Sequence, residues 1–250
     1  MHGQTCTDRQ IITITGTERA DFLQGLISND IAQAKTGLLY AALLTPQGKY
    51  LADFFLLDQG AHILLDIKSD LAPALIQRLS MYKLRADVTI TATEMPVHRG
   101  TGTPPAGGFA DPRHPSLGWR FYGEARLDPT DTDWDALRVA ACIPETGIEL
   151  IPNDTFILEA GFERLHGVDF KKGCYVGQEV TARMKHKTEL RKGLALVGVT
   201  GSAPSGTEIT ANGKTAGTLY TQAGGQGIAY LRFDRAQGDM TADSATLKRL

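Results

Sequence analysis

A single cysteine stands inside a strongly basic stretch of the chain. Residues 171–192 contain seven Lys and Arg residues but only two acids, whereas the whole chain carries a net charge of −2. Cys174 follows Gly173 and lies shortly before a predicted helix start at Gly177 and Gln178. Positive neighbours and a helix N-terminus both stabilise a thiolate, so we predict a reactive thiol here. A solvated helix face and a buried, inert cysteine are the alternatives that the pattern leaves open.

The cations of this stretch are suited to hold a carboxylate or a phosphate, because crowded positive charges repel one another unless an anion lies among them. They are Lys171, Lys172, Arg183, Lys185, Lys187, Arg191 and Lys192. Nucleic acid is one such anion, but the acidic balance of the chain argues against it as a partner. His166 and His186 flank Cys174 in the sequence, but no motif supports a cysteine hydrolase.

The other two cysteines, Cys6 and Cys142, lie far from Cys174 in the sequence, and the odd number fits no disulfide framework. No two cysteines are spaced as C-x-x-C, so we expect no metal site and no resident cluster with local cysteine ligands. We predict that Cys142 is buried in the last turn of a helix and that Cys6 belongs to a disordered terminus.

The first part of the chain predicts an α+β domain with helices packed on a mostly antiparallel sheet. Alternating or continuous apolar residues predict strands, and apolar residues spaced three or four apart predict helices that follow residue 16 and Ser69, the second capped by that serine. Thr45-Pro46-Gln47-Gly48 is typical of a tight turn between two strands. The predicted strands cover residues 10–15, 38–45, 50–57, 61–67 and 86–91.

The later part of the chain changes character twice. Residues 100–118 are rich in Gly, Pro and Thr and predict a loop, followed by a strand at 119–122 and a helix at 133–142. Beyond Lys192, short strands at 194–199, 207–210, 215–220 and 227–232 alternate with Gly-rich turns, as in a small β-barrel. We therefore predict an α+β lobe at 1–95, a second α+β lobe with the cysteine motif at 96–187, interleaved with the first, and a barrel at 188–250.

The segment 172–179, Lys-Gly-Cys-Tyr-Val-Gly-Gln-Glu, resembles the signature of the YgfZ family, which is related to the aminomethyltransferase of the glycine cleavage system. The residues that follow it are similar to the mitochondrial branch of the family, which helps to assemble 4Fe–4S clusters. The likeness extends along the chain through residues 22–30, 45–49 and 167–170. It implies three lobes around a central channel, with a C-terminal β-barrel and with tetrahydrofolate or a one-carbon derivative in the channel.

The resemblance also implies roles for individual residues. Glu159, in Leu158-Glu159-Ala160-Gly161, matches the segment whose glutamate grips the donor edge of the pterin, although an exposed helix-end glutamate is the alternative. The glutamate tail of the folate requires cations, for which we predict Arg183, Lys185 and Arg191. Tyr82 and Arg85 are candidates to line the folate channel, and a position in the hydrophobic core is the alternative for Tyr82. The remaining predicted cofactor contacts are Asn29, Lys172, Gly173, Tyr175, Gln178 and Glu179.

One departure from the relatives concerns catalysis. The aminomethyltransferase has adjacent aspartates where this chain has Ala52 and Asp53, and one of the two assists chemistry at the folate nitrogen. The sequence therefore leaves open whether the protein is an enzyme. The leading hypothesis is a folate-binding accessory protein for assembly or repair of iron–sulfur proteins, which acts with assembly proteins or client enzymes through Cys174. The alternative is a folate-dependent aminomethyl or one-carbon transferase that uses Asp53.

Two further expectations concern location. No apolar run approaches the length that crosses a bilayer, so we expect no membrane partner. The N-terminus shows no basic start followed by an apolar stretch, so we predict no signal peptide and a cytoplasmic location.

Overall fold

The computed structural model describes residues 1–186 and 189–250, which form two compact units. The first unit contains Met1–Asp131 and Glu163–Gln178, and the second contains Thr132–Phe162 and Glu179–Leu250. Each unit is therefore assembled from two separate stretches of the chain. The three-part division given above stays a prediction, and its boundary at residues 187–188 lies outside the described residues.

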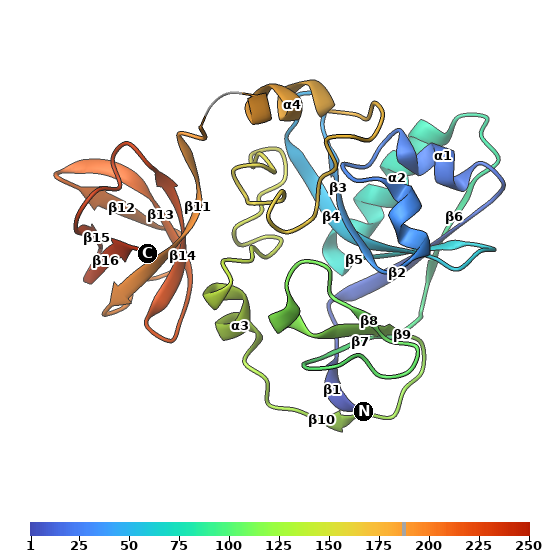
Figure 1. Ribbon diagram of the computed structural model, residues 1–250, viewed down its shortest axis with the longest axis horizontal. Helices are drawn as coiled ribbons and strands as arrows, with labels where there is room; N and C mark the ends of the chain where they lie inside the picture. Colours follow the sequence, from blue (N-terminus) through green and yellow to red (C-terminus); the bar gives the residue numbers. More distant parts are fainter. Residues whose placement is uncertain (187–188) are drawn as a thin grey trace. The chain divides into compact units, whose positions relative to one another are not determined.

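An antiparallel five-stranded sheet with two helices on one face forms the core of the first unit (Figure 1). The helices α1 (Arg19–Gln24) and α2 (Ala72–Lys83) contribute apolar side chains such as Leu23 and Leu75 to this core. This arrangement confirms the predicted α+β class. In spatial order the strands are β3 (Leu39–Leu44), β4 (Tyr50–Asp58), β5 (Ile63–Lys68), β2 (Arg9–Thr15) and β6 (Thr89–Thr93).

The turn between β3 and β4 forms as predicted. The Gly48 amide donates to the Thr45 carbonyl over 2.8 Å, and Gly48 adopts a φ of 75°, which a glycine reaches without steric cost. The predicted cap of α2 is wrong. Ser69 begins a 3₁₀ turn, η2 (Ser69–Leu71), and α2 then starts at Ala72 with a proline in its first turn.

The first unit contains a second five-stranded sheet, of which only one strand, β9 (Trp119–Tyr122), was predicted from the sequence. Its other strands are short, and β8 lies inside the segment predicted as a loop. Cys6 directly follows β1, is buried, and donates its backbone N–H to the Val97 carbonyl over 2.8 Å. The prediction of a disordered terminus is therefore wrong, because pairing with β7 holds β1 in place. The strands are β10 (Asp128–Pro129), β1 (His2–Thr5), β7 (Val97–Gly100), β9 (Trp119–Tyr122) and β8 (Phe109–Ala110).

The second unit contains a closed six-stranded barrel, which confirms the predicted C-terminal barrel (Figure 1). The last two strands were not predicted, because they are short and carry few apolar residues. They close the barrel, since β16 pairs with β11 and leaves no free edge there. The strands, in spatial order, are β11 (Lys192–Thr200), β14 (Gln226–Arg232), β13 (Lys214–Ala223), β12 (Thr207–Ala211), β15 (Met240–Ala242) and β16 (Ala245–Arg249).

Helix α3 (Trp134–Ala140) packs beside the barrel in the second unit. The Asp133 carboxylate caps it by accepting the Ala136 N–H over 2.9 Å. The buried Arg138 joins this helix to the barrel by pairing with Glu149 at 3.0 Å and donating to Thr221 of β13. Cys142 lies just beyond the helix at a φ of 50° and is half-buried, so the predicted buried position in its last turn is wrong. The remaining helical elements are η1 (Ile31–Lys35), η3 (Pro115–Leu117) and α4 (Gln178–His186).

Candidate functional site

Cys174 is exposed on the loop of the first unit that precedes α4. Gly173 beside it is also exposed, whereas Lys172 and Tyr175 on either side are buried. The Lys172 ammonium lies 4.9 Å from the centre of the Tyr175 ring, which attracts the cation. The thiol is therefore exposed to solvent on a two-residue segment that has a buried side chain at each end. The alternative of a buried, inert cysteine is excluded at this position.

The Lys172 side chain is directed to the backbone of the segment that follows α1. Its Nζ donates to the carbonyls of Gln24 at 2.7 Å, Ile27 at 2.6 Å and Asn29 at 3.0 Å. An ammonium has three N–H donors, so these three acceptors use all of them. Burial lowers the pKa of Lys172 to about 8, and the nearby carboxylates of Asp30 and Asp169 oppose that shift, so the group is mostly charged at neutral pH.

Further hydrogen bonds join the two ends of the first unit at the same place. The Ser28 hydroxyl donates to the Gly167 carbonyl at 2.6 Å, and the Asp169 carboxylate accepts the backbone N–H groups of Lys171 and Lys172. Asn29, a predicted cofactor contact, donates its side-chain amide to the carbonyls of Tyr40 and His166. Three side chains, those of Lys172, Ser28 and Asn29, thus fix the segment that carries Cys174 to residues 24–29, and Asp169 supports the cysteine loop from within its own segment.

Gly177 brings the end of the cysteine loop against the turn between β3 and β4. It has a φ of 85°, and a Cβ atom there would lie 2.6 Å from the Thr45 carbonyl oxygen. Only glycine fits both this approach and this conformation. The next residue, Gln178, begins α4 and donates its backbone N–H to the Tyr175 carbonyl at 3.2 Å. The predicted helix start is confirmed.

Glu159 is a buried carboxylate of the second unit, with 8% of its surface exposed. Its Oε2 accepts a hydrogen bond from the Tyr230 hydroxyl at 2.6 Å, and its backbone carbonyl accepts the Leu194 N–H at 2.7 Å. Gly193 passes so close that a Cβ there would lie 2.8 Å from the Glu159 carbonyl oxygen. Burial and the bond to Glu159 raise the pKa of the Tyr230 hydroxyl. The alternative of an exposed helix-end glutamate is excluded.

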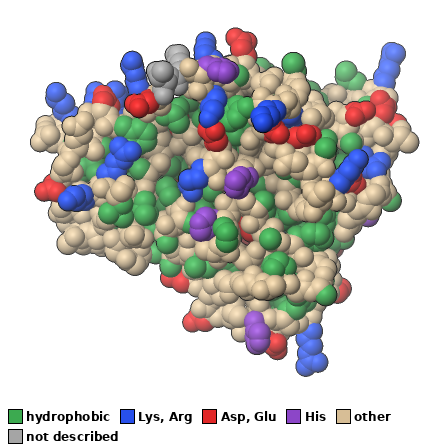
Figure 2. Space-filling model, in the orientation of Figure 1, with side chains coloured by type: hydrophobic (Ala, Val, Ile, Leu, Met, Phe, Trp, Pro, Cys, Tyr) green, Lys and Arg blue, Asp and Glu red, His purple; other side chains and the backbone are tan. Residues whose placement is uncertain are grey.

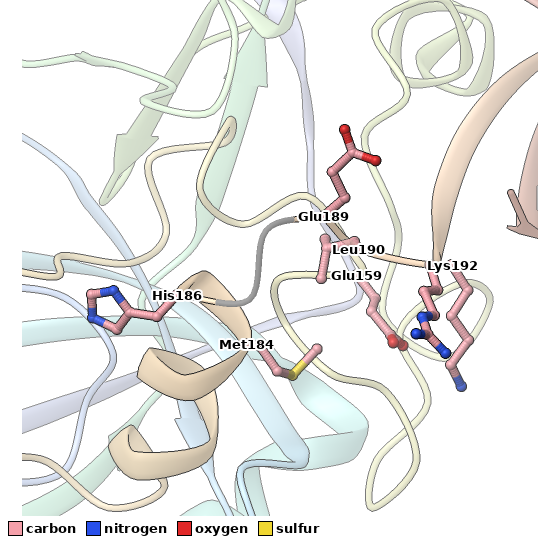
Figure 3. Close-up of a pocket in the computed structure, with 7 residues that line it drawn as sticks. Glu159, Met184, His186, Glu189, Leu190 and Lys192 are labelled. Carbon is pink, nitrogen blue, oxygen red and sulfur yellow. The ribbon is translucent and has the colours of Figure 1, made fainter.

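The Glu159 carboxylate faces a cavity of about 620 Å³ within the second unit, and Figure 3 shows the side chains around it. Lys192 lies 5.6 Å from the centre of the Tyr230 ring, so Tyr230 connects this cation to Glu159. The cavity therefore combines one buried and one exposed carboxylate, apolar side chains and two cations, Arg191 and Lys192. It is lined by Glu159, Met184, His186, Glu189, Leu190, Arg191 and Lys192.

The Lys and Arg residues of the stretch 171–192 are divided between the two units and differ in burial. Lys172 is buried in the first unit, whereas Arg191 lines the cavity of the second unit. Arg183 and Lys185 are exposed on α4, as is Glu179 at its start. Lys187 lies outside the described residues. On the face drawn in Figure 2, Lys and Arg side chains are interspersed with Asp and Glu, which gives no support to a nucleic-acid surface there.

Tyr82 and Arg85, which were predicted to line the folate channel, lie at the end of α2 and just beyond it in the first unit. Tyr82 is half-buried and packs against the core of helices and sheet, as the alternative for this residue supposed. Arg85 is exposed, and Leu84 between them is 85% exposed at a φ of 45°. The role of both residues in cofactor binding stays a prediction.

Asp53 is buried on β4 with 5% of its surface exposed, and two tyrosine hydroxyls donate to it. Tyr40 reaches Oδ2 at 2.9 Å and Tyr50 reaches Oδ1 at 2.6 Å. Burial and the Asp53 carboxylate raise the pKa of Tyr40 well above its ordinary value. Ala52 points to the opposite face of the strand, into the apolar core with α1 and α2. A second aspartate at 52 would therefore be a carboxylate in that core.

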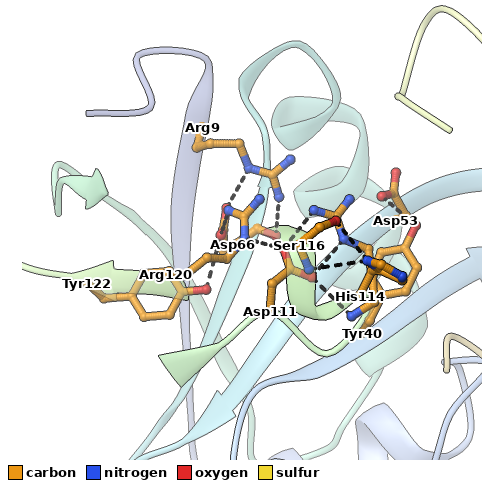
Figure 4. Close-up of polar contacts among 10 residues, drawn as sticks. Arg9, Tyr40, Asp53, Asp66, Asp111, His114, Ser116, Arg120 and Tyr122 are labelled. Atoms are coloured by element: carbon orange, nitrogen blue, oxygen red, sulfur yellow. Dashed lines mark hydrogen bonds and ion pairs between the residues drawn. The ribbon is translucent and has the colours of Figure 1, made fainter. Parts of the chain in front are cut away.

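A buried ionic cluster beside Asp53 was missed from the sequence (Figure 4). Asp66 on β5 pairs with Arg9 at 2.6 Å and Arg120 at 2.7 Å, and the Tyr122 hydroxyl donates to it at 3.1 Å. The Arg120 guanidinium also lies 4.0 Å from the centre of the Phe55 ring. An aspartate among the otherwise apolar residues 63–67 was the available signal, because a charge in a buried strand requires a partner.

The described residues contain neither a helix that could span a membrane nor a group of side chains placed to hold a metal ion. No described helix is long and apolar enough to cross a membrane. No group of three or more His, Cys, Asp or Glu side chains in the described part of the chain is placed to hold a metal ion.

The fold is that of an aminomethyltransferase-like protein. The structure is similar to the crystal structure of the glycine cleavage system aminomethyltransferase T from Bartonella henselae, with a TM-score of 0.78. The likeness covers 98% of this chain and 83% of that chain at 14% sequence identity, so it concerns the fold alone. Together with the closed barrel, it confirms the predicted fold class.

Sequence relatives then identify the family. The chain is 31% identical to the mitochondrial iron–sulfur cluster assembly factor IBA57 of Mus musculus and 30% identical to that of Homo sapiens. Each match covers 93% of this chain and 78% of the relative. The C-terminal β-barrel domain described for the CAF17 family matches residues 191–249. The chain belongs to the family of iron–sulfur cluster assembly factors named IBA57, in agreement with the resemblance to the YgfZ type.

The relatives also correct one prediction. The chain is 32% identical to the homologue from Mycosarcoma maydis over 74% of this chain, and it spans only 54% of that longer protein. This relative and the two mammalian ones are named mitochondrial, which contradicts the predicted cytoplasmic location. Composition and the absence of a visible signal peptide were a weak basis for that prediction, because a targeting segment is separable from the folded protein.

Proposed function

We propose that this protein is a tetrahydrofolate-binding accessory protein in the assembly or repair of iron–sulfur proteins, with Cys174 as its reactive residue. The family supports the assembly role, since the relatives are named as iron–sulfur cluster assembly factors. The partners are assembly proteins or client iron–sulfur enzymes. The observation that carries the proposal is an exposed thiol on a loop that buried side chains fix at both ends.

The surroundings of Glu159 fit tetrahydrofolate or a one-carbon derivative. A carboxylate has about four lone-pair sites, so Glu159 can accept the Tyr230 hydroxyl and still accept donors from a pterin edge. Its cavity falls in the usual size range for small-ligand sites, and Met184 and Leu190 supply apolar contacts. Arg191 and Lys192 supply positive charge for the glutamate tail. A folate would provide the one-carbon chemistry, and these residues would bind and orient it.

The test compares the activities of 4Fe–4S enzymes in cells that lack the protein and carry wild type, Cys174→Ala or Glu159→Ala. We expect Cys174→Ala to give no recovery of these activities. A fluorescence titration of the purified proteins with tetrahydrofolate should show binding by wild type and Cys174→Ala, and weaker binding by Glu159→Ala. Full recovery with Cys174→Ala, combined with no folate binding by folded wild type, would overturn the proposal.

A folate-dependent aminomethyl or one-carbon transferase is the second candidate, and the position of Asp53 favours it. This carboxylate is buried and held by two tyrosines, as a group with a fixed chemical role would be. Ala52 counts against it, because that side chain belongs to the apolar core. A turnover assay with an aminomethyl or methylamine donor and saturating tetrahydrofolate separates the two candidates. Absence of methylene-tetrahydrofolate would exclude the transferase.

A further inference from the structure

Near Cys174, the ammonium of Lys172 donates all three of its N–H groups to backbone carbonyls of the protein. Lys172 has 7% of its surface exposed, and its Nζ lies within 3.0 Å of three carbonyl oxygens. Carbonyl groups that converge on one point favour an ammonium, because a neutral amine has only two N–H groups to donate. The hydrogen bonds are charge-assisted, and such bonds are stronger than those between neutral groups.

The three acceptors lie at the end of α1 and in the segment directly after it. Gln24 ends that helix, and Ile27 and Asn29 follow it within five residues. The same segment accepts the Val176 N–H at the Gly25 carbonyl, on the other side of the cysteine. The backbone is therefore attached to one support both before and after Gly173 and Cys174.

We propose that Lys172 is a positioning residue for Cys174, which fixes the exposed residues 173–174 by binding three carbonyls of the segment 24–29. This inference rests on the proposed function of Cys174, and it assigns Lys172 a task distinct from contact with a folate. Lys171 provides the contrast. Its side chain is exposed, although it places a positive charge only one residue farther from Cys174 in sequence.

The test compares Lys172→Met with Lys171→Met, which removes the same charge without the same contacts. Hydrogen exchange should become about tenfold faster or more at the amides of residues 24–29 and 167–176 in Lys172→Met, and should not change there in Lys171→Met. Lys172→Arg should not restore protection, because a planar guanidinium cannot direct three donors from one atom. Equal exchange in wild type and Lys172→Met would overturn the proposal.

A nitroxide attached to Cys174 gives a second measurement, which a role in overall stability alone would not change. The label is placed in a Cys142→Ser background, and Cys6 is buried. At pH 7, where the ammonium keeps its three donors to the carbonyls of residues 24, 27 and 29, the label should show low mobility in wild type and in Lys171→Met. Lys172→Met should show high mobility at the same pH. Equal label mobility in wild type and Lys172→Met would overturn the proposal.

The two proposals fail in distinguishable ways. If Cys174→Ala fully supports 4Fe–4S enzymes in cells, the proposed function of the thiol is wrong, whatever the exchange data show. If Cys174→Ala is inactive but Lys172→Met retains wild-type activity and wild-type exchange, the function stands and the positioning role is wrong.

Discussion

The cysteine loop of the first unit and the Glu159 cavity of the second unit hold their key side chains in opposite ways. Cys174 is exposed to solvent, whereas Lys172 and Tyr175, on either side of the exposed pair 173–174, are buried. Glu159 is itself buried, and it lies beside a cavity of about 620 Å³. An exposed thiol is accessible to a large partner, whereas a buried carboxylate at a cavity selects a small ligand by hydrogen bonds.

We therefore expect the proposed reaction at Cys174 and the proposed recognition of a folate at Glu159 to be separable. The thiol depends on backbone contacts that restrict its loop, and the carboxylate depends on Tyr230 and on the close passage of Gly193. Substitutions in one region should therefore leave the other region intact. The predictions below test that separation.

The largest effect is expected at the thiol. Cys174→Ser should reduce the activity of 4Fe–4S enzymes to the level of cells without the protein, because a hydroxyl is a far poorer nucleophile and metal ligand than a thiolate. Tetrahydrofolate affinity should remain that of wild type in a fluorescence titration. A large loss of affinity would show that the two regions share one function.

The next effect concerns the carboxylate. Glu159→Gln should weaken tetrahydrofolate binding by about 10- to 100-fold, because one charged hydrogen-bond acceptor contributes about 1.5–3 kcal/mol. Tyr230→Phe is the matched control, and it should weaken binding less because it removes only a support of the carboxylate. The rate at which iodoacetamide alkylates Cys174 should be unchanged in both variants, and a changed rate would contradict the separation.

A smaller effect is expected from alanine substitutions at two glycines, one beside Glu159 and one in the cysteine loop. Gly193→Ala should lower tetrahydrofolate affinity, because its Cβ would lie 2.8 Å from the Glu159 carbonyl oxygen and displace that backbone. Gly173→Ala should change the free energy of unfolding by less than about 0.5 kcal/mol, since a Cβ there meets no atom within 4 Å. Urea unfolding and folate titration of both variants measure this. Strong destabilisation by Gly173→Ala would show that the turn itself, and not its anchors, fixes the loop.

The smallest effect is a pH dependence of stability. The pKa of Lys172 is about 8 in the folded protein, against an ordinary value of 10.5. Between these values the unfolded chain binds a proton that the folded chain does not, so the free energy of unfolding should rise with pH relative to Lys172→Met. Urea unfolding of both proteins from pH 7.5 to 10.5 measures the difference, and parallel curves would contradict the lowered pKa.

Local patterns predicted much of the fold. Alternating or continuous apolar residues gave the five strands of the first sheet and four strands of the barrel, and Thr45-Pro46-Gln47-Gly48 gave the turn. The short strands β1, β7, β8, β15 and β16 were missed, because two to five residues carry too little periodicity. Their pairing depends on partners that lie far away in the sequence.

The sequence predicted which residues belong to the candidate site, but it did not predict their contacts. The sequence indicated Cys174, Glu159 and Asp53, but it assigned Lys172 to the cofactor without any sign of the three carbonyls that it binds. The pairing of Asp66 with Arg9 and Arg120 was equally invisible, because the three residues are distant in the chain. Contacts between distant segments leave no local pattern.

We predicted the α+β class, the C-terminal barrel, the family and a cysteine before a helix start from the sequence alone, because these features depend on local spacing and on short motifs. The folded structure was needed to show that Cys174 is exposed, that Glu159 is buried beside Tyr230, and that Lys172 binds the segment 24–29. Exposure and hydrogen-bond partners are properties of packing, and packing is complete only when distant segments meet.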